Sequence, residues 1–229
     1  YKQGDEEEWA RIHIKSGEFM SMEEGLKTFH DFYDSFIEEL PKRLFFVVNQ
    51  EGEKVATATI SLLTQPEYGY SAVADWFAIK KEYQGMKLSK PMINHFIKLA
   101  HELGHKKLLL HTQTHTWLAA KLYLDFGFEP FHVEDDIKGW QILKTITNHP
   151  RLANIEAIDE KDMYFDVALK TKEILDQKFG EDYEYVIWHK NGRHDVEVNQ
   201  KGVLYKFQYA DDGDQFTLEE VKQKQNQKR

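Results

Sequence analysis

The feature that most constrains the fold is a succession of strand, loop, helix, strand and helix between residues 70 and 128. The segment YSAVADWFAI at 70–79 is rich in β-branched and aromatic residues and predicts a strand, which the loop KKEYQGMKLS follows. Apolar residues then recur at helical spacing from Ser89 until Gly104, which favours a helix end. The segment KKLLLHTQT predicts a further strand, and WLAAKLYLDF predicts a short helix ending at Gly127. This alternation predicts an α/β fold in which helices flank a sheet.

The flanking segments extend this sheet. The acidic stretch GDEEEW suits a helix N-terminus, and residues 22–40 carry a helical apolar pattern that Pro41 is expected to end. RLFFVVNQ and KVATATISLL predict a hairpin about a turn at Glu51-Gly52. FEPFHV and GWQILKTIT are expected to form a closing hairpin around EDDIKG.

The character of the chain changes after Asn148-His149-Pro150, so we expect one domain over 1–149 and a small α+β extension over 150–229. The extension predicts an amphipathic helix at 162–179, a three-stranded meander with a turn at Asn191-Gly192, and a terminal helix or tail. We interpret it as a packing extension or dimer contact. The alternative is a partner-binding or specificity module built on its aromatic residues, which are Tyr183, Tyr185, Trp188, Tyr205 and Phe207.

Composition narrows the function. The 30 basic and 39 acidic side chains give a net charge of −9, which opposes nucleic-acid binding and suits a cationic partner such as an amine. The absence of cysteine excludes disulfides, thiolate metal sites and a cysteine nucleophile. The longest uncharged apolar stretch, near residues 55–63, is far shorter than the roughly 20 residues that span a bilayer. The acidic start YKQGDEEEWA lacks the apolar core of a secretory signal. We therefore expect a cytoplasmic protein that binds no membrane.

The loop after residue 79 has the character of an anion site. A strand that ends in a glycine-containing loop and leads into a helix directs unpaired backbone N–H groups and the helix dipole at one point. Ser89 is expected to cap this helix, with Pro91 in its first turn. QGMKLS alone is a weak motif, and an ordinary strand-to-helix turn is the alternative.

The order of elements and the motifs QGMKLS and LYLDFGF together resemble the GNAT superfamily of acyl-CoA-dependent N-acetyltransferases. The resemblance covers residues 1 to about 147 and implies an α/β fold whose central sheet is mixed, largely antiparallel and flanked by helices. The loop pattern of that family falls on Gln84, Lys87 and Ser89, so both positions that the family fills with small residues are altered. Thr116 stands where the family often has asparagine seven residues before its tyrosine.

The resemblance implies acetyl-CoA as cosubstrate and assigns positions to its binding. The strand at 70–79 would part from the strand at 107–113, and the pantetheine arm would lie between them. The backbone of Phe77, Ala78 and Ile79 would bond that arm and the acetyl carbonyl. The pyrophosphate would lie on seven loop residues and Thr116; the loop residues are Gln84, Gly85, Met86, Lys87, Leu88, Ser89 and Lys90.

The resemblance also implies the catalytic groups. Tyr123 would hydrogen-bond or protonate the departing thiolate, although a core aromatic is the alternative reading of its position. An alkyl amine must lose a proton before it attacks, and the candidate bases are Asp75, His111 and Glu67, or a water chain. We expect direct acetyl transfer to a small-molecule or peptide amine, and a homodimer stays open. The alternative is a GNAT-like module that binds acyl-CoA or a partner without turnover.

The sequence HELGH at residues 101–105 competes with this interpretation because it matches the zinc-metallopeptidase motif, with His111 at the spacing of a third ligand. The extended motif requires glycine where this chain has Leu108, and residues 106–110 read as a strand. The chain also holds 11 histidines, so H-x-x-x-H pairs such as His111 and His115 arise by chance. We therefore expect no metal at His101, Glu102 and His105.

Overall fold

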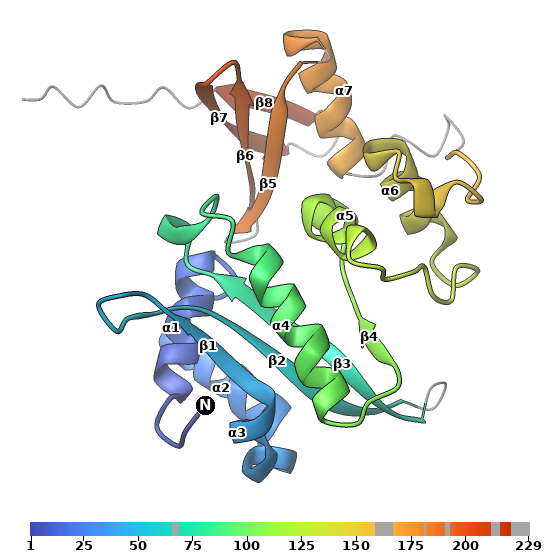
Figure 1. Cartoon of the computed structure of the whole chain (residues 1–229). Coiled ribbons are helices and arrows are strands. Elements are labelled where there is room, and N and C mark those ends of the chain that lie inside the picture. The colour runs from blue at the N-terminus through green and yellow to red at the C-terminus, as the bar shows by residue number, and fades with distance from the viewer. Residues whose placement is uncertain (66–68, 159–166, 181, 191–192, 212–215, 221–229) are drawn as a thin grey trace, which may run out of the picture. The chain divides into compact units, whose positions relative to one another are not determined.

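The computed structural model describes residues 1–65, 69–158, 167–180, 182–190, 193–211 and 216–220. The chain divides into two compact units, Tyr1–His111 and Thr112–Arg229. Each unit contains one four-stranded sheet, and the elements are labelled in Figure 1. The predicted mixed α/β fold with a C-terminal α+β extension is confirmed. The domain boundary expected between residues 149 and 150 stays a prediction.

The helical segments of the first unit are α1 (Glu6–Ser16), α2 (Met22–Tyr33), η1 (Asp34–Glu39), α3 (Leu40–Arg43), η2 (Lys81–Tyr83) and α4 (Ser89–Glu102). Helix α2 is capped by Ser21, whose hydroxyl accepts the backbone N–H of Glu24 at 3.1 Å. The helix predicted over 22–40 is wrong in its second half, because Phe36 has a non-helical backbone. Pro41 does not end a helix but lies in the first turn of α3. Proline is tolerated there because the N–H groups of a first turn have no partner within the helix, so its missing N–H removes no hydrogen bond.

The sheet of the first unit has the order β1 (Leu44–Val48), β2 (Lys54–Gln65), β3 (Gly69–Ile79) and β4 (Leu108–Leu110). The first three strands pair antiparallel, which confirms the predicted hairpin of β1 and β2. The short strand β4 pairs parallel to β3. A parallel neighbour requires a crossover, and the segment with η2 and α4 provides it.

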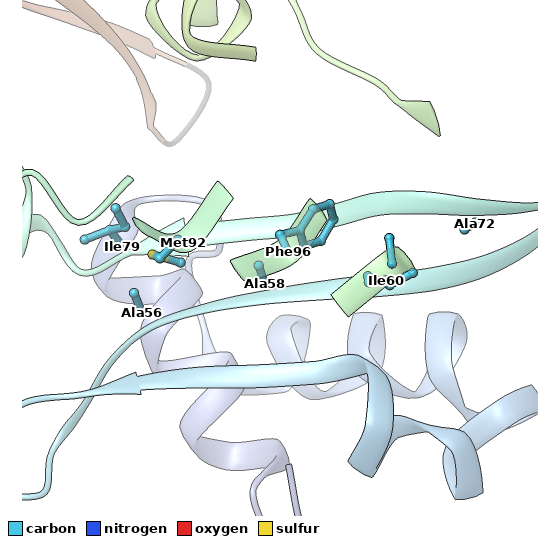
Figure 2. Packing of buried hydrophobic residues seen from close by; sticks show 8 residues of the cluster. Ala56, Ala58, Ile60, Ala72, Ile79, Met92 and Phe96 are labelled. Atoms are coloured by element: carbon cyan, nitrogen blue, oxygen red, sulfur yellow. The ribbon is translucent and has the colours of Figure 1, made fainter. Parts of the chain in front are cut away.

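One face of this sheet packs on α4. Alternate residues of β2 and β3 point to the helix, and Figure 2 shows them against Met92 and Phe96. Most of these strand residues are alanines, so the helix axis comes close to the sheet. The buried cluster consists of Ala56, Ala58, Ile60, Ala72, Ile79, Met92, Phe96 and Ala100.

The opposite face of the sheet lies under α1 and α2, as Figure 1 shows. Here β2 presents a polar row, Thr57, Thr59 and Ser61, all of them buried. The hydroxyl of Tyr33 on α2 donates to Thr59 Oγ1 at 2.9 Å, so part of this row is hydrogen-bonded. Around it lies an aromatic core that includes Trp9, in which rings meet mostly edge to face.

The second unit contains η3 (Thr114–Thr116), α5 (Trp117–Asp125), α6 (Ile137–Thr147), η4 (Pro150–Leu152), α7 (Val167–Phe179), β5 (Glu184–Lys190), β6 (Arg193–Gln200), β7 (Val203–Asp211) and β8 (Phe216–Glu220). Its sheet is an antiparallel meander of β5, β6, β7 and β8 in that order. Leu175 of α7 packs on this sheet, beside Tyr185 and Phe207, which are both buried. Tyr185 and Phe207 thus belong to the core of this unit; the side chain of Trp188 lies outside the described residues.

Two predictions for the second half of the chain are wrong. The expected closing hairpin is not formed, because GWQILKTIT belongs to helix α6. Its apolar residues Ile137, Trp140, Leu143 and Ile146 recur every three positions, which also fits a helix. The extension has a fourth strand, β8, where a terminal helix or tail was expected. Its FTLEE alternates apolar and polar residues and pairs with β7, while residues 221–229 lie outside the described part.

No helix in the described ranges is long and apolar enough to cross a membrane.

Candidate active site

The sheet of the first unit opens where β3 continues past β4. The parallel pairing of these strands covers three pairs and ends at Ala74 and Leu110, although β3 runs on to Ile79. Near the same point, the pairing of β3 with β2 is irregular between Thr57 and Thr59, and Trp76 has a φ of +50°. A bulge of this kind bends a strand and redirects its side chains. The last residues of β3 therefore have a free edge on the side that β4 has left.

The peptide groups of Ile79 face this free edge. Lys80 donates its backbone N–H to Val55 O on β2 at 2.9 Å, so Lys80 forms a hydrogen-bonded pair with β2. Hydrogen-bonded and non-hydrogen-bonded pairs alternate along an antiparallel ladder. Ile79 is consequently directed away from β2, whereas Ala78 is directed toward it; Phe77 lies within the irregular pairing, where this alternation does not apply. Of the three residues implied for the acyl arm, Ile79 thus presents its backbone to this edge, and because its carbonyl oxygen accepts from Gln84, the Ile79 N–H is the group that can meet a ligand.

The loop after β3 is closed by its own glutamine. Gln84 Nε2 donates to the carbonyl oxygen of Ile79 at 2.9 Å, which ties the loop to the strand end. Gly85 has a φ of +76° and Lys87 a φ of +62°, both in the left-handed region. Alternation of left- and right-handed residues turns successive N–H groups toward one point and forms an anion-binding concavity. The loop keeps this conformation although lysine stands where the resemblance expects glycine.

The loop leads directly into α4. The expected cap at Ser89 is wrong, because Leu88 takes the capping position and no side chain bonds the helix end there. The first N–H groups of a helix have no partner within the helix, so those of Ser89 and Lys90 add to the loop donors. The side chains of Lys87 and Lys90 are exposed and can approach a bound anion. These features fit a pyrophosphate, for which N–H donors and positive charge are both favourable.

A network of hydrogen bonds that the sequence did not predict joins the turn between β1 and β2 to the residues just before this loop. Glu53, in the turn between β1 and β2, accepts from Lys80 Nζ at 2.7 Å and from the Tyr83 hydroxyl at 2.9 Å. Asn49 Nδ2 donates to the same hydroxyl at 2.9 Å. The hydrogen bonds from Lys80 and Tyr83 hold the pKa of the Glu53 carboxyl below its usual range. The partners are about thirty positions apart, and no local pattern signals such a network.

Two of the candidate bases come together where the strands part. Asp75 directly follows the last residue of β3 that pairs with β4, and His111 directly follows β4. Burial raises the pKa of the Asp75 carboxyl, against the opposing effects of the Trp76 N–H, at 3.0 Å, and of the His111 charge. The His111 side chain is exposed. A half-buried carboxylate with a raised pKa is a better base than an ordinary one. Glu67 lies outside the described residues.

Tyr123 and Thr116 belong to the second unit and are described within it. Tyr123 lies on α5, and its ring meets Phe128 edge to face at 5.8 Å. Burial raises the pKa of the Tyr123 hydroxyl to about 12, so this phenol is protonated at neutral pH. Thr116 Oγ1 donates to Gln113 O at 2.9 Å and lies 3.0 Å from Thr112 Oγ1. Thr116 thereby stabilises the turn that precedes α5.

The HELGH segment does not have the geometry that its motif requires. Helix α4 ends at Glu102, so His105 lies beyond the helix on which both histidines should sit. Arg43 Nη1 lies 3.0 Å from His105 Nε2 and, as guanidinium has no acceptor, it is the donor. Burial and the Arg43 charge lower the pKa of His105. Within the described ranges no group of three or more metal-binding side chains occurs.

The fold and the loop define an α/β domain with an anion-binding turn between β3 and α4. A model of the Acetyltransferase (GNAT) family matches residues 7–128, which is more than half of the 229 residues. The chain therefore belongs to the GNAT acetyltransferase family, and the predicted resemblance is confirmed. This membership supports acetyl transfer as its general reaction. The matched span includes the free edge of β3, the loop and Tyr123.

Comparison with solved structures gives low similarity scores. A predicted acetyltransferase with acetyl-CoA from Clostridium acetobutylicum is 16% identical, with a TM-score of 0.44, covering 58% of this chain and 88% of that one. A probable acetyltransferase is 11% identical, with a TM-score of 0.42, covering 54% and 81%. Glucosamine-6-phosphate N-acetyltransferase from Arabidopsis thaliana is 12% identical, with a TM-score of 0.37, covering 54% and 87%. No curated protein matches the chain. The family assignment therefore depends on the sequence match.

Proposed function

We propose that the protein transfers the acetyl group of acetyl-CoA to a primary amine by direct attack. The observation that carries this proposal is the strand end and loop of a GNAT-family chain: β3 runs past its pairing with β4 and leaves a free edge that includes the Ile79 N–H, and left-handed residues shape the loop that follows. The free edge suits a strand-like pantetheine arm, because amide groups can bond there as in a ladder. The loop N–H groups and the exposed lysines suit the pyrophosphate.

The chemistry follows from the residues at this edge. Asp75 accepts a proton from the ammonium form of the acceptor, and the neutral nitrogen attacks the thioester carbonyl carbon. A C–N bond forms and the C–S bond breaks, so CoA leaves as a thiolate, and the second proton that the attacking nitrogen must lose to become an amide passes to solvent. The carbonyl oxygen becomes negative on the way, and a backbone N–H at the free edge stabilises it. No covalent enzyme intermediate is required.

Tyr123 assists the departing thiolate in this proposal. Its raised pKa, about 12, makes it a weaker acid than an ordinary phenol. A thiol has a pKa of about 8.5, so complete proton transfer from the phenol would be unfavourable. The role that fits these values is hydrogen-bond donation to the sulfur, with the final proton coming from solvent.

The test combines calorimetry with an assay of CoA release. The parent should bind acetyl-CoA and desulfo-CoA and should release CoA only when an amine is added. Asp75→Asn should lower kcat by about 100-fold or more, in the range of general-base catalysis, and Tyr123→Phe should lower kcat as well. Both variants should bind acetyl-CoA as the parent does.

Binding of acetyl-CoA without transfer to any amine would support a non-catalytic acyl-CoA-binding module and overturn the proposal. Parent turnover in Asp75→Asn would remove Asp75 as the base and leave His111, Glu67 or a water chain. Parent turnover in Tyr123→Phe would end the role given to Tyr123.

A further inference from the structure

The acceptor can be characterised further if the proposed function holds, because a base must lie within hydrogen-bond reach of the proton that it removes. In that function the acceptor nitrogen lies at Asp75. The side chains beside Asp75 therefore contact the part of the acceptor next to its nitrogen, and their chemistry restricts the class of amine.

The residue that follows Asp75 is an aromatic in a strained conformation. Trp76 has a φ of +50°, which is unusual for a bulky side chain. Strain of this kind persists only where surrounding contacts determine it, and it concentrates at functional sites. The Trp76 ring meets Phe19 at 5.5 Å, Trp9 at 5.4 Å and Phe32 at 5.0 Å between centroids. An aromatic wall therefore stands next to the carboxylate.

Part of this wall is accessible. Phe32 on α2 is 38% exposed, and it meets Trp76 at an interplanar angle of 88°. Trp76 itself is half-buried. Such rings offer apolar area to a ligand.

The charge beside the wall favours one kind of ligand. The proposed base function requires the carboxylate form of Asp75, and the charged group identified as acting on it is His111. A carboxylate or phosphate on the acceptor close to its nitrogen would be repelled by Asp75, whereas an ammonium group would be attracted. An acceptor that carries several charges has little apolar surface, so it would make few apolar contacts with the aromatic wall.

We infer that the acceptor is a small primary arylalkylamine, whose ammonium group meets Asp75 and whose aromatic body packs on Trp76 and Phe32. This inference rests on the proposed function and narrows its substrate class. It separates the expected acceptor from amino sugars that carry phosphate, from polyamines, and from α-amino acids.

The test is a comparison of kcat/KM for a panel of amines at saturating acetyl-CoA. The central pair is 2-phenylethylamine and phenylalanine, which differ only in a carboxylate. Spermidine, glucosamine 6-phosphate and a lysine-containing peptide complete the panel. We expect 2-phenylethylamine to exceed each of the others by about 10-fold or more, as repulsion or loss of aromatic contact requires.

A matched pair of variants locates the wall. Phe32→Ala should raise KM for 2-phenylethylamine by about 5- to 10-fold, the size of a lost aromatic contact, with KM for acetyl-CoA unchanged. Ile97→Ala is the control, because Ile97 is 36% exposed and lies on α4, on the other face of the sheet. It should change neither constant.

The outcomes distinguish this inference from the proposed function. Preferred acetylation of spermidine, glucosamine 6-phosphate, phenylalanine or the peptide would overturn the inference and keep the proposed function. Absence of acetyl transfer to every amine would overturn both. An unchanged KM for 2-phenylethylamine in Phe32→Ala would also overturn the inference, since the wall would then not touch the acceptor.

Discussion

At the scale of single residues, Lys87 occupies a backbone conformation that usually belongs to glycine. Its φ of +62° places its Cβ close to the backbone, which costs roughly 1–2 kcal/mol for a residue other than glycine. Lysine supplies a positive charge in return, at the point where the loop N–H groups converge. We interpret Lys87 as a compromise between backbone strain and attraction for the pyrophosphate.

Two substitutions of Lys87 separate these effects. Lys87→Gly should raise the free energy of unfolding by up to about 1 kcal/mol, because relief of strain exceeds the added freedom of the unfolded chain. Lys87→Asn, which tolerates the left-handed region, should do the same to a smaller extent. Both should weaken acetyl-CoA binding at low salt and less so at high salt. Urea unfolding and calorimetry measure the two quantities. Unchanged affinity in both variants would show that the lysine charge does not contact the cofactor.

His13 is the residue from which we expect acid sensitivity. It is buried against Trp9 at 4.2 Å, and Nε2 has no hydrogen-bond partner among the described residues. Burial lowers the pKa of His13 to about 3. Because the folded pKa lies below the unfolded value of about 6.5, the neutral imidazole favours the folded state above pH 6.5 and this stability is lost as the pH falls.

The loss from His13 should approach about 1.4 kcal/mol for each pH unit between 6.5 and 3. His13→Phe keeps an aromatic ring against Trp9 and removes the titration, so unfolding free energy should fall less steeply with acid. Urea titrations at several pH values give this slope. The control is His101→Phe on the exposed face of α4, which should keep the parent slope. An identical slope in the His13 variant would contradict the assignment.

At the scale of elements, the loop before α4 is held by a strand turn far from it in sequence. Glu53 joins the β1–β2 turn to Lys80, which precedes η2, and to Tyr83, the last residue of η2. The Lys80 side chain is buried, so its charge depends on this partner. We expect the network to position Gln84 and the residues after it for binding.

Glu53→Gln should raise KM for acetyl-CoA by roughly 2- to 10-fold, as expected for the loss of one or two hydrogen bonds, while kcat stays near that of the parent. Tyr83→Phe should act in the same direction. Glu51→Gln changes an exposed carboxylate of the same turn and should have no effect on either constant. Equal effects of Glu51→Gln and Glu53→Gln would show that only the overall charge matters.

The sequence predicted the helix and strands around this loop but not the side-chain contacts that join them. The spacing of apolar residues indicated β2, β3 and α4. Each of these elements buries one face, so apolar residues recur along it at the period of a strand or of a helix. The same spacing gave the wrong structure for α6, since a short apolar run fits a strand and a helix alike. It could not show the left-handed backbone of Trp76 and Lys87, which tertiary contacts determine, or the link of Glu53 to Tyr83. The proximity of Asp75 and His111 also depended on the register of β3 and β4.

At the scale of the whole molecule, the span that matches the family ends inside the second unit. The match stops at residue 128, whereas α5, which carries Tyr123, packs in a core built partly from residues beyond 149. Leu152 and Ile155 bury Ala120 and Leu124 of α5. His149 Nε2 lies 3.2 Å from Asp125 Oδ1 at the end of the same helix. The residues after 149 thus contribute to the packing of the helix that carries a proposed catalytic group.

This packing predicts that a change outside the matched family span lowers acetyl transfer. Leu152→Ala removes a fully buried side chain and should cost about 2–5 kcal/mol of unfolding free energy. Its CoA release should fall with the fraction of folded second unit, while acetyl-CoA should still bind the loop of the first unit. Val203→Ala, at a side chain 52% exposed, is the control and should stay within about 0.5 kcal/mol of the parent. Thermal unfolding, calorimetry and the CoA-release assay on the full chain make the comparison. Full activity in Leu152→Ala at a temperature where the second unit is unfolded would show that α5 takes no part in the reaction.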